Sequence, residues 1–204
     1  MEVAIVKYNA GNIRSVELAL ERIGIQAIIT EDHDRLRNAD RVILPGVGEA
    51  STAMTHLKAN GLDAVLLGLR QPVLGICLGL QLLCQHTEEG DTAGLGIFNA
   101  KVHQFELASQ GLKVPHVGWS QIALADMVDQ VNNQLLDGIT MPAYVYFVHS
   151  YFATVGPDTI ATCTYGHPFS AALRKGNYYA TQFHPEKSAG VGSKILQNFI
   201  DLKV

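Results

Sequence analysis

The sequence predicts an α/β protein with a mostly parallel central sheet and helices on both of its faces. Up to Gln85, short apolar runs typical of buried strands alternate with segments of helical periodicity. After Gly90, apolar runs follow one another across short turns, which indicates antiparallel strands. The 204 residues, 48% hydrophobic and 17% charged, are enough for one large core but not for two comfortable ones. We therefore expect a single domain, residues 1–204, with antiparallel additions to the sheet in its C-terminal half.

The elements can be assigned in order from these patterns. The apolar run Val3–Val6 predicts a first strand, and Ile13, Val16 and Leu20 recur at helical spacing until Gly24. Further strands are expected at 25–29, 42–44 and 72–76, with helices at 49–59, 62–69 and 78–85. The second half predicts strands at 98–107, 113–124, 144–154, 159–165, 170–174 and 178–183, and a closing helix at 191–202.

Charge and cysteine content exclude several classes of protein. The formal charge of −4 and the scattered basic residues disfavour nucleic acid as a partner. Three cysteines without paired spacing argue against a disulfide framework and a zinc site, so we expect no metal and no cofactor. No apolar run approaches the ~18 residues that cross a membrane, and the N-terminus lacks a signal-peptide pattern, which predicts a cytoplasmic protein.

The segment Gly75-Ile76-Cys77-Leu78-Gly79 places a cysteine between two glycines where a strand is expected to become a helix. Glycines allow such a tight turn, and the following helix directs its first N–H groups and its positive dipole end at the sulfur. Both effects favour the reactive thiolate. Chance would give this pattern roughly 0.03 times in a chain of this composition. The pattern predicts a nucleophile, with a small buried packing cysteine as the alternative.

A cysteine nucleophile needs a base and donors for an oxyanion. His184 follows an expected strand, and Glu186 stands two residues later across Pro185, where its carboxylate can orient the imidazole. The N–H groups of Leu78 and of Val47, the latter within Pro-Gly-Val-Gly at 45–48, are candidate oxyanion donors. Taken singly, a structural turn and an ordinary loop remain the alternatives for these two segments.

The three segments together resemble the class I (triad) glutamine amidotransferases over essentially the whole chain. They are Gly-Ile-Cys-Leu-Gly-Leu-Gln at 75–81, His-Pro-Glu at 184–186 and Pro-Gly-Val-Gly at 45–48. Within that class, segments 8–16, 115–119, 146–151 and 183–188 are similar to the glutaminase subunits of imidazole glycerol phosphate synthases. The resemblance implies a single flavodoxin-like glutamine amidotransferase domain from residue 1 to residue 204.

The resemblance also implies a reaction and a set of residues. Cys77 would attack the side-chain amide of glutamine, His184 would carry protons, and Glu186 would orient His184, with a glutamyl thioester as intermediate. Substrate-binding positions carried over from the family are Gly46, Gly48, Gln81, Glu89, Ser150 and Tyr151. Two other classes of protein are the alternatives: a cysteine peptidase or unrelated hydrolase, and a non-catalytic interaction protein. Gln81 with the His-Pro-Glu order disfavours the first, and the intact triad disfavours the second.

The implied partner is a separate cyclase subunit with a (β/α)₈ barrel, bound as a heterodimer and receiving the ammonia. Trp119, Tyr146, His149 and Lys187 are candidates for the face that meets it. The flexible Gly-Val-Gly segment could stay non-productive until this partner docks. Ser120 stands where the family usually has Asn, so a related glutaminase subunit that supplies ammonia to a surface-sugar or other amidation partner is the alternative.

Overall fold

A computed structural model describes residues 1–8, 11–125 and 134–203 of the chain, so part of the expected 8–16 segment lies outside the described residues. Five strands run parallel: β1 (Val3–Val6), β2 (Ala27–Thr30), β3 (Arg41–Leu44), β4 (Val73–Ile76) and β13 (Tyr178–Thr181). Four antiparallel strands continue the sheet: β8 (His116–Leu124), β9 (Ala143–His149), β11 (Thr159–Tyr165) and β12 (His167–Lys175). The order is β2-β1-β3-β4-β13-β12-β11-β8-β9.

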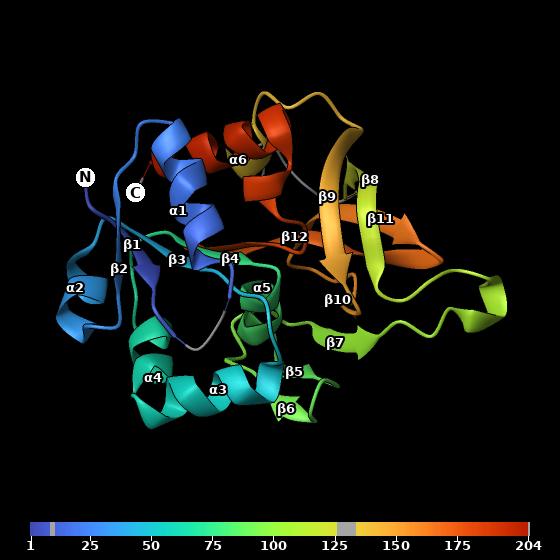
Figure 1. The fold of residues 1–204 in the computed structure, drawn as a ribbon, viewed down its shortest axis with the longest axis horizontal. Helices are drawn as coiled ribbons and strands as arrows, with labels where there is room; N and C mark the ends of the chain where they lie inside the picture. Colours follow the sequence, from blue (N-terminus) through green and yellow to red (C-terminus); the bar gives the residue numbers. More distant parts are fainter. Residues whose placement is uncertain (9–10, 126–133, 204) are drawn as a thin grey trace.

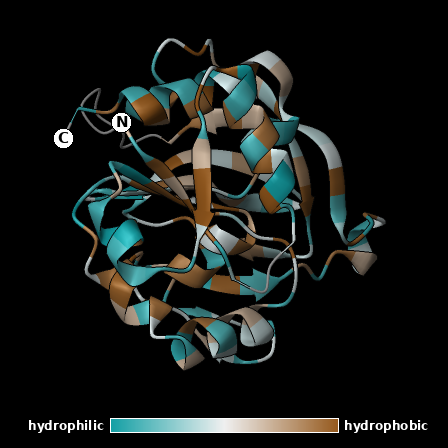
Figure 2. Cartoon of the chain, turned by 60° about the vertical axis from the view of Figure 1, so that its left-hand side comes forward, coloured by the Kyte–Doolittle hydropathy of each residue, from teal (hydrophilic) through white to brown (hydrophobic). Residues whose placement is uncertain are grey.

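Helices cover both faces of this sheet (Figure 1). One face carries α1 (Ile13–Arg22) and α6 (Ala189–Asp201). The other carries α2 (His33–Asn38), α3 (Ala50–Ala59), α4 (Leu62–Leu67) and α5 (Leu78–Leu83). The alternation within β1 shows how the sheet divides two cores: Val3 and Ile5 join the cluster under α1 and α6, whereas Ala4 and Val6 join the other. Figure 2 shows the apolar central strands between helices of mixed polarity.

A second, smaller sheet lies beside the first. It contains β10 (Tyr151–Ala153), β7 (Lys101–Gln104), β5 (His86–Thr87) and β6 (Thr92–Ala93), in the order β10-β7-β5-β6. The expected single strand 144–154 is therefore wrong, because the chain breaks at Ser150 and passes from β9 in the large sheet to β10 in the small one. The strands β5 and β6 and the short helix α2 were not expected, because elements of two and six residues carry too little periodicity.

The predicted fold class is confirmed, although several boundaries differ. The helix expected to reach residue 69 ends at Leu67, where Gly68 caps it, and the one expected to reach residue 85 ends at Leu83. Cys84 is extended, and Gln85 then pairs with Ala100 toward the small sheet. Two short 3-10 turns, η1 (Ala108–Gln110) and η3 (Pro185–Lys187), complete the elements used below. Among the described residues, no helix is long and apolar enough to cross a membrane.

The topology positions the predicted site residues. Strands β3, β4 and β13 are adjacent and parallel, so their carboxyl ends meet at one edge of the sheet. The segment 45–48 leaves β3, Cys77 leaves β4, and the segment 182–186 leaves β13. Three pieces of chain that are far apart in sequence thus meet where ligands collect in open parallel sheets.

Candidate active site

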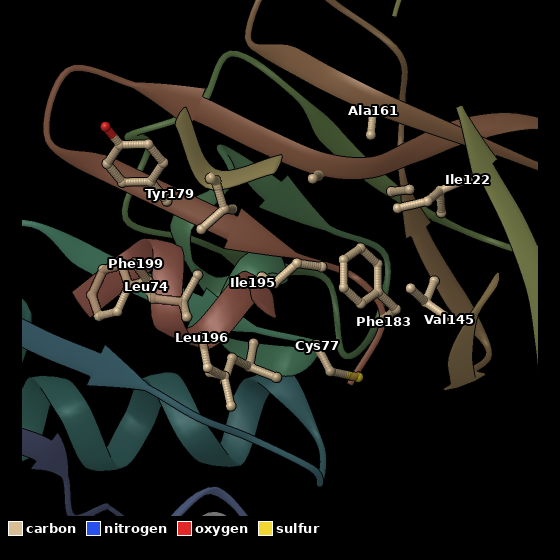
Figure 3. Close-up of a cluster of buried hydrophobic side chains, with 14 of the residues drawn as sticks. Leu74, Cys77, Ile122, Val145, Ala161, Tyr179, Phe183, Ile195, Leu196 and Phe199 are labelled. Carbon is tan, nitrogen blue, oxygen red and sulfur yellow. The ribbon is translucent and has the colours of Figure 1, made fainter. Parts of the chain in front are cut away.

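Cys77 occupies a sharp, strained turn between β4 and α5. Its backbone φ of 52° is positive, which is uncommon and costly for a residue other than glycine. The flanking glycines make this turn possible, since a Cβ on Gly79 would lie 2.0 Å from the Leu44 carbonyl oxygen, and one on Gly75 would lie 2.9 Å from the Gly79 backbone. Cys77 joins the buried cluster that includes Phe183, and Figure 3 labels both side chains. Gly79 therefore lets α5 pack directly against β3, and Gly75 lets β4 pack closely against α5.

Cys77 lines a cavity of about 250 Å³. This volume is below the ~300–1,000 Å³ of pockets that hold drug-sized ligands, so it suits a small metabolite. Lining residues include most of the predicted oxyanion and substrate positions: Val47, Gly48, Leu78, Gln81, Glu89, Ser150 and Tyr151. The wall also contains Pro115, Val148 and His149.

His184 and Glu186 form a buried pair beside this cavity. His184 Nδ1 lies 2.7 Å from Glu186 Oε1, and both side chains are fully buried. Burial lowers the pKa of His184, but interactions with Cys77 and with Glu186 outweigh it and raise the pKa to about 10. His184 Nε2 has no hydrogen-bond partner of regular geometry among the described residues. The imidazole thus has one nitrogen fixed by a carboxylate and the other left for chemistry near Cys77.

Two polar residues that the sequence analysis did not assign complete this arrangement. Asn12 Nδ2 donates to Glu186 Oε1 and lies 3.5 Å from His184 Nδ1. Gln182, fully buried, donates from Nε2 to the Cys77 sulfur at 3.7 Å. Asn12 belongs to segment 8–16, which carries part of the family resemblance. Gln182 directly precedes Phe183-His184, and no motif in the sequence marks it as a site residue.

The two predicted oxyanion donors are not both available. The Leu78 N–H donates to the Gly46 carbonyl oxygen at an N···O distance of 3.3 Å. In a planar trans peptide the C=O and N–H point in opposite directions, so the Val47 N–H points away from Leu78. Gly46 cannot be larger, because a Cβ there would lie 2.4 Å from the Tyr8 hydroxyl oxygen. The described structure therefore holds a carbonyl oxygen where an oxyanion would need donors.

Glu89 also lines the cavity. Its Oε2 accepts a hydrogen bond from the Ala50 N–H at 2.8 Å, at the start of α3. Burial raises the pKa of Glu89, the Ala50 hydrogen bond opposes this, and the neighbouring Glu49 adds to it. Its Oε1 has no hydrogen-bond partner within the part of the chain that the structure describes, so this oxygen can meet a cationic group of a ligand.

The predicted partner face is only partly as expected. Trp119 and Tyr146 are directly paired on β8 and β9, their rings meet edge to face at 6.2 Å, and Trp119 is 51% exposed. Lys187 is exposed, and its ammonium lies 5.9 Å from the Tyr146 ring centre. His149 does not belong to this face: it is 5% exposed and its side chain lies on the inner side of β9. The expectation of an exposed His149 was wrong because β9 alternates, and 149 shares the inward phase of Val145 and Phe147.

A comparison with protein families shows which class of protein this chain belongs to. The family model for "Glutamine amidotransferase class-I" matches residues 4–202, so this protein is a class I glutamine amidotransferase.

Its similar relatives are more specific. The "Imidazole glycerol phosphate synthase subunit HisH" of Bacteroides thetaiotaomicron is 54% identical over 202 residues, which cover 99% of this chain and 100% of that protein. The protein of the same name from Idiomarina loihiensis is 44% identical over 99% of this chain and 98% of its own length.

Solved structures agree on the fold. A "Crystal structure of glutamine amidotransferase" has a TM-score of 0.73 at 19% identity and covers 98% of this chain and 97% of its own. The "Structure of PurLQS from Thermotoga maritima" has a TM-score of 0.70 at 15% identity, with the same coverage. At these identities the likeness concerns the fold.

Proposed function

We propose that this chain is the glutaminase subunit of an imidazole glycerol phosphate synthase and hydrolyses glutamine to glutamate and ammonia. The observation that carries the proposal is the meeting of Cys77 with the buried His184–Glu186 pair at a cavity the size of a small metabolite. The full-length similarity to proteins named as this subunit supports the same reading and implies that a partner subunit exists.

The chemistry follows from the groups at the cavity. Cys77 sulfur, as the thiolate, attacks the amide carbon of the glutamine side chain and forms a C–S bond. The protonated His184 then gives its Nε2 proton to the amide nitrogen, which leaves as ammonia when the C–N bond breaks. The neutral imidazole next removes a proton from water, which attacks the thioester carbonyl. Glutamate departs, and the sulfur leaves as thiolate beside an imidazolium, which restores the starting state.

Binding of glutamine uses the opposite end of the cavity. Glu89 offers a carboxylate oxygen to the substrate's α-ammonium group, and Gln81 lines the same cavity. The pKa of Glu89 is raised by burial, so a bound ammonium would lower it again and the pairing would strengthen. Backbone from Ser150 and Tyr151 closes the wall.

The carbonyl of Gly46 keeps the resting site inactive. Stabilising the oxyanion requires the Gly46–Val47 peptide to rotate, so that the Val47 N–H joins the Leu78 N–H. Gly46 and Gly48 flank Val47 in the sequence, and Gly48 already has a φ of +137° that few other residues adopt. Docking of the partner is the event that supplies the energy for this rotation.

The ammonia acceptor is a cyclase subunit with a (β/α)₈ barrel, which forms a heterodimer with this chain and makes imidazole glycerol phosphate and an aminoimidazole carboxamide ribotide. Ammonia would be protonated in open water, so the subunits must meet over a dry path. Trp119, Tyr146 and Lys187 offer an aromatic face with one cation for this contact. Ser120, the departure from the family's usual Asn, bonds inward to His116 and does not alter that face.

The test is glutamate release with and without a cyclase partner, in the wild type and in Cys77→Ala. We expect turnover only in the wild type and a large increase on adding the partner. Turnover that persists in Cys77→Ala would reject the assigned chemistry, and equal rates with and without partner would reject the switch. An assay for imidazole glycerol phosphate with the same complex decides between this acceptor and a surface-sugar pathway.

A further inference from the structure

A chain of hydrogen bonds runs from β8 through the core to the wall of the cavity. His116 and His149 are directly paired residues of β8 and β9, 2% and 5% exposed. His116 Nδ1 lies 3.0 Å from His149 Nε2, and His116 Nε2 lies 2.8 Å from Ser120 Oγ. His149 Nδ1 lies 2.8 Å from the Tyr151 carbonyl oxygen. No step of the proposed reaction uses these imidazoles.

The last acceptor fixes the direction of every bond in this chain. The Tyr151 carbonyl can only accept, so His149 Nδ1 carries a hydrogen, and in a neutral ring its Nε2 must accept. His116 Nδ1 therefore donates to His149, His116 Nε2 accepts, and the Ser120 hydroxyl donates. Both rings must be in the Nδ1–H tautomer.

Both rings are neutral at pH 7. Burial lowers the pKa of His116 to about 4. Burial likewise lowers the pKa of His149 to about 3, with His116 and His184 adding to the effect and the Tyr151 hydrogen bond opposing it. The titratable ring of Tyr165 stacks on His116 at 4.1 Å between ring centres. Buried polar rings among aromatic side chains are costly unless each nitrogen is satisfied, as they are here.

The Tyr151 carbonyl is also the junction with the substrate side. Gln81 Nε2 donates to this oxygen at 3.0 Å and to Gln182 Oε1 at 3.3 Å. Gln182 Nε2 donates in turn to the Cys77 sulfur at 3.7 Å. The carbonyl that ends the histidine chain thus also holds the amide groups that lie beside the nucleophile.

We infer that His116 and His149 are positioning residues of the glutaminase site, whose one-way hydrogen bonds hold the Tyr151 carbonyl and, through it, the Gln81 amide that contacts glutamine. The identity of glutamine as the substrate in this inference rests on the proposed function, whereas the direction of the hydrogen bonds does not. Ser120, at the far end, supplies the first donor.

The tautomers can be read directly from the wild-type protein. Long-range ¹H–¹⁵N correlation spectra of the imidazoles in the full ¹⁵N-labelled chain at pH 7 should show both rings as Nδ1–H. In His149→Leu, His116 has lost its acceptor on that side and is expected to shift toward the Nε2–H form, donating to Ser120. A wild-type Nε2–H form at either ring would overturn the inference.

A matched pair of variants separates positioning from packing. Asn at position 149 places an amide N–H where His149 Nδ1 stands and can still donate to Tyr151, whereas Leu of similar size cannot. Glutamine protection of Cys77 from iodoacetamide measures binding without turnover. We expect the half-protecting glutamine concentration to rise about fivefold in His149→Leu and to stay within about twofold in His149→Asn, as the loss of one neutral hydrogen bond implies.

A purely packing role predicts the reverse order, because leucine fills an aromatic core better than a buried amide does. Equal or inverted effects of the two variants would therefore reject the positioning role. Absence of any glutamine protection in the wild type would reject the proposed substrate instead. The wild-type tautomers would still decide the direction of the hydrogen bonds between Ser120 and Tyr151.

Discussion

Replacing Asn12 by glycine should lower glutaminase turnover without straining the backbone. Asn12 precedes α1 with a left-handed φ of 73°, and its side chain donates to Glu186 Oε1. The other oxygen, Glu186 Oε2, is buried without a partner among the described residues. Removing the Asn12 amide therefore leaves the carboxylate that orients His184 with a single hydrogen bond from a side chain.

The expected fall in kcat can be estimated from the charge of Glu186 and the exposure of Asn12. A hydrogen bond to a charged group contributes roughly 1.5–3 kcal/mol, and the half-buried Asn12 belongs at the lower end. About 1.5 kcal/mol corresponds to a roughly tenfold fall in kcat. Glycine adopts the left-handed conformation without strain, so the free energy of unfolding should fall only by the lost hydrogen bond, about 1.5 kcal/mol. Asn12→Ala should lose the same activity and about 1 kcal/mol more stability than Asn12→Gly, because alanine is strained there.

The assay is glutamate release at saturating glutamine with the partner bound, combined with thermal unfolding of each variant. Asn60→Ala is the matched control, since Asn60 caps α3 through the His56 carbonyl, is exposed and does not touch the site. We expect kcat near one tenth in both Asn12 variants, and an unfolding temperature about 2–4 °C lower in Asn12→Ala than in Asn12→Gly. A kcat for Asn12→Gly within twofold of the wild type would refute the reasoning.

Two further outcomes test the turn and the imidazole. Gly79→Ala should destabilise the folded protein by about 1–3 kcal/mol or more, because its Cβ would lie 2.0 Å from the Leu44 carbonyl oxygen. Gly190→Ala is the control: its Cβ would meet no atom within 4 Å, so the unfolding temperature should stay the same or rise. The pKa of His184 is raised from 6.5 to about 10, so its contribution to stability is complete below pH 6.5 and is lost as the pH rises toward 10. Unfolding temperatures from pH 6 to 10 should fall more steeply in the wild type than in Cys77→Ala, since Cys77 is one cause of the raised pKa; identical slopes would contradict this.

The sequence was most informative where geometry is local. Gly75 and Gly79 are needed because the backbone itself leaves no space at the Cys77 turn, and such a requirement is written into the residues on either side. The order of parallel strands then brings His184 to the same edge, which alternating strands and helices predict.

Residues whose roles depend on distant pairing could not be predicted in the same way. Asn12 meets Glu186 across 174 positions, and Gln182 meets Cys77 across 105. Nothing near either residue in sequence signals those contacts. His149 was a different failure, because the alternating phase of Val145 and Phe147 could have placed it inward, but the expected strand ran unbroken through Ser150 and obscured where the alternation ends.

The geometry at Gly46 also bears on how much energy the proposed switch requires. The Gly46 carbonyl is held by one long hydrogen bond of 3.3 Å from Leu78, and the Val47 carbonyl accepts separately from the Gly11 N–H at 3.1 Å. A hydrogen bond contributes a net stabilisation of about 0.5–1.5 kcal/mol, so the bond from Leu78 favours the resting orientation of the Gly46–Val47 peptide only modestly. At the upper end this is a preference of about ten to one, and a partner that favours the rotated form by about 3 kcal/mol would invert it. In the proposed complex, contacts on the Trp119 and Tyr146 face would have to supply that preference for a surface interaction to control a single peptide group in the site.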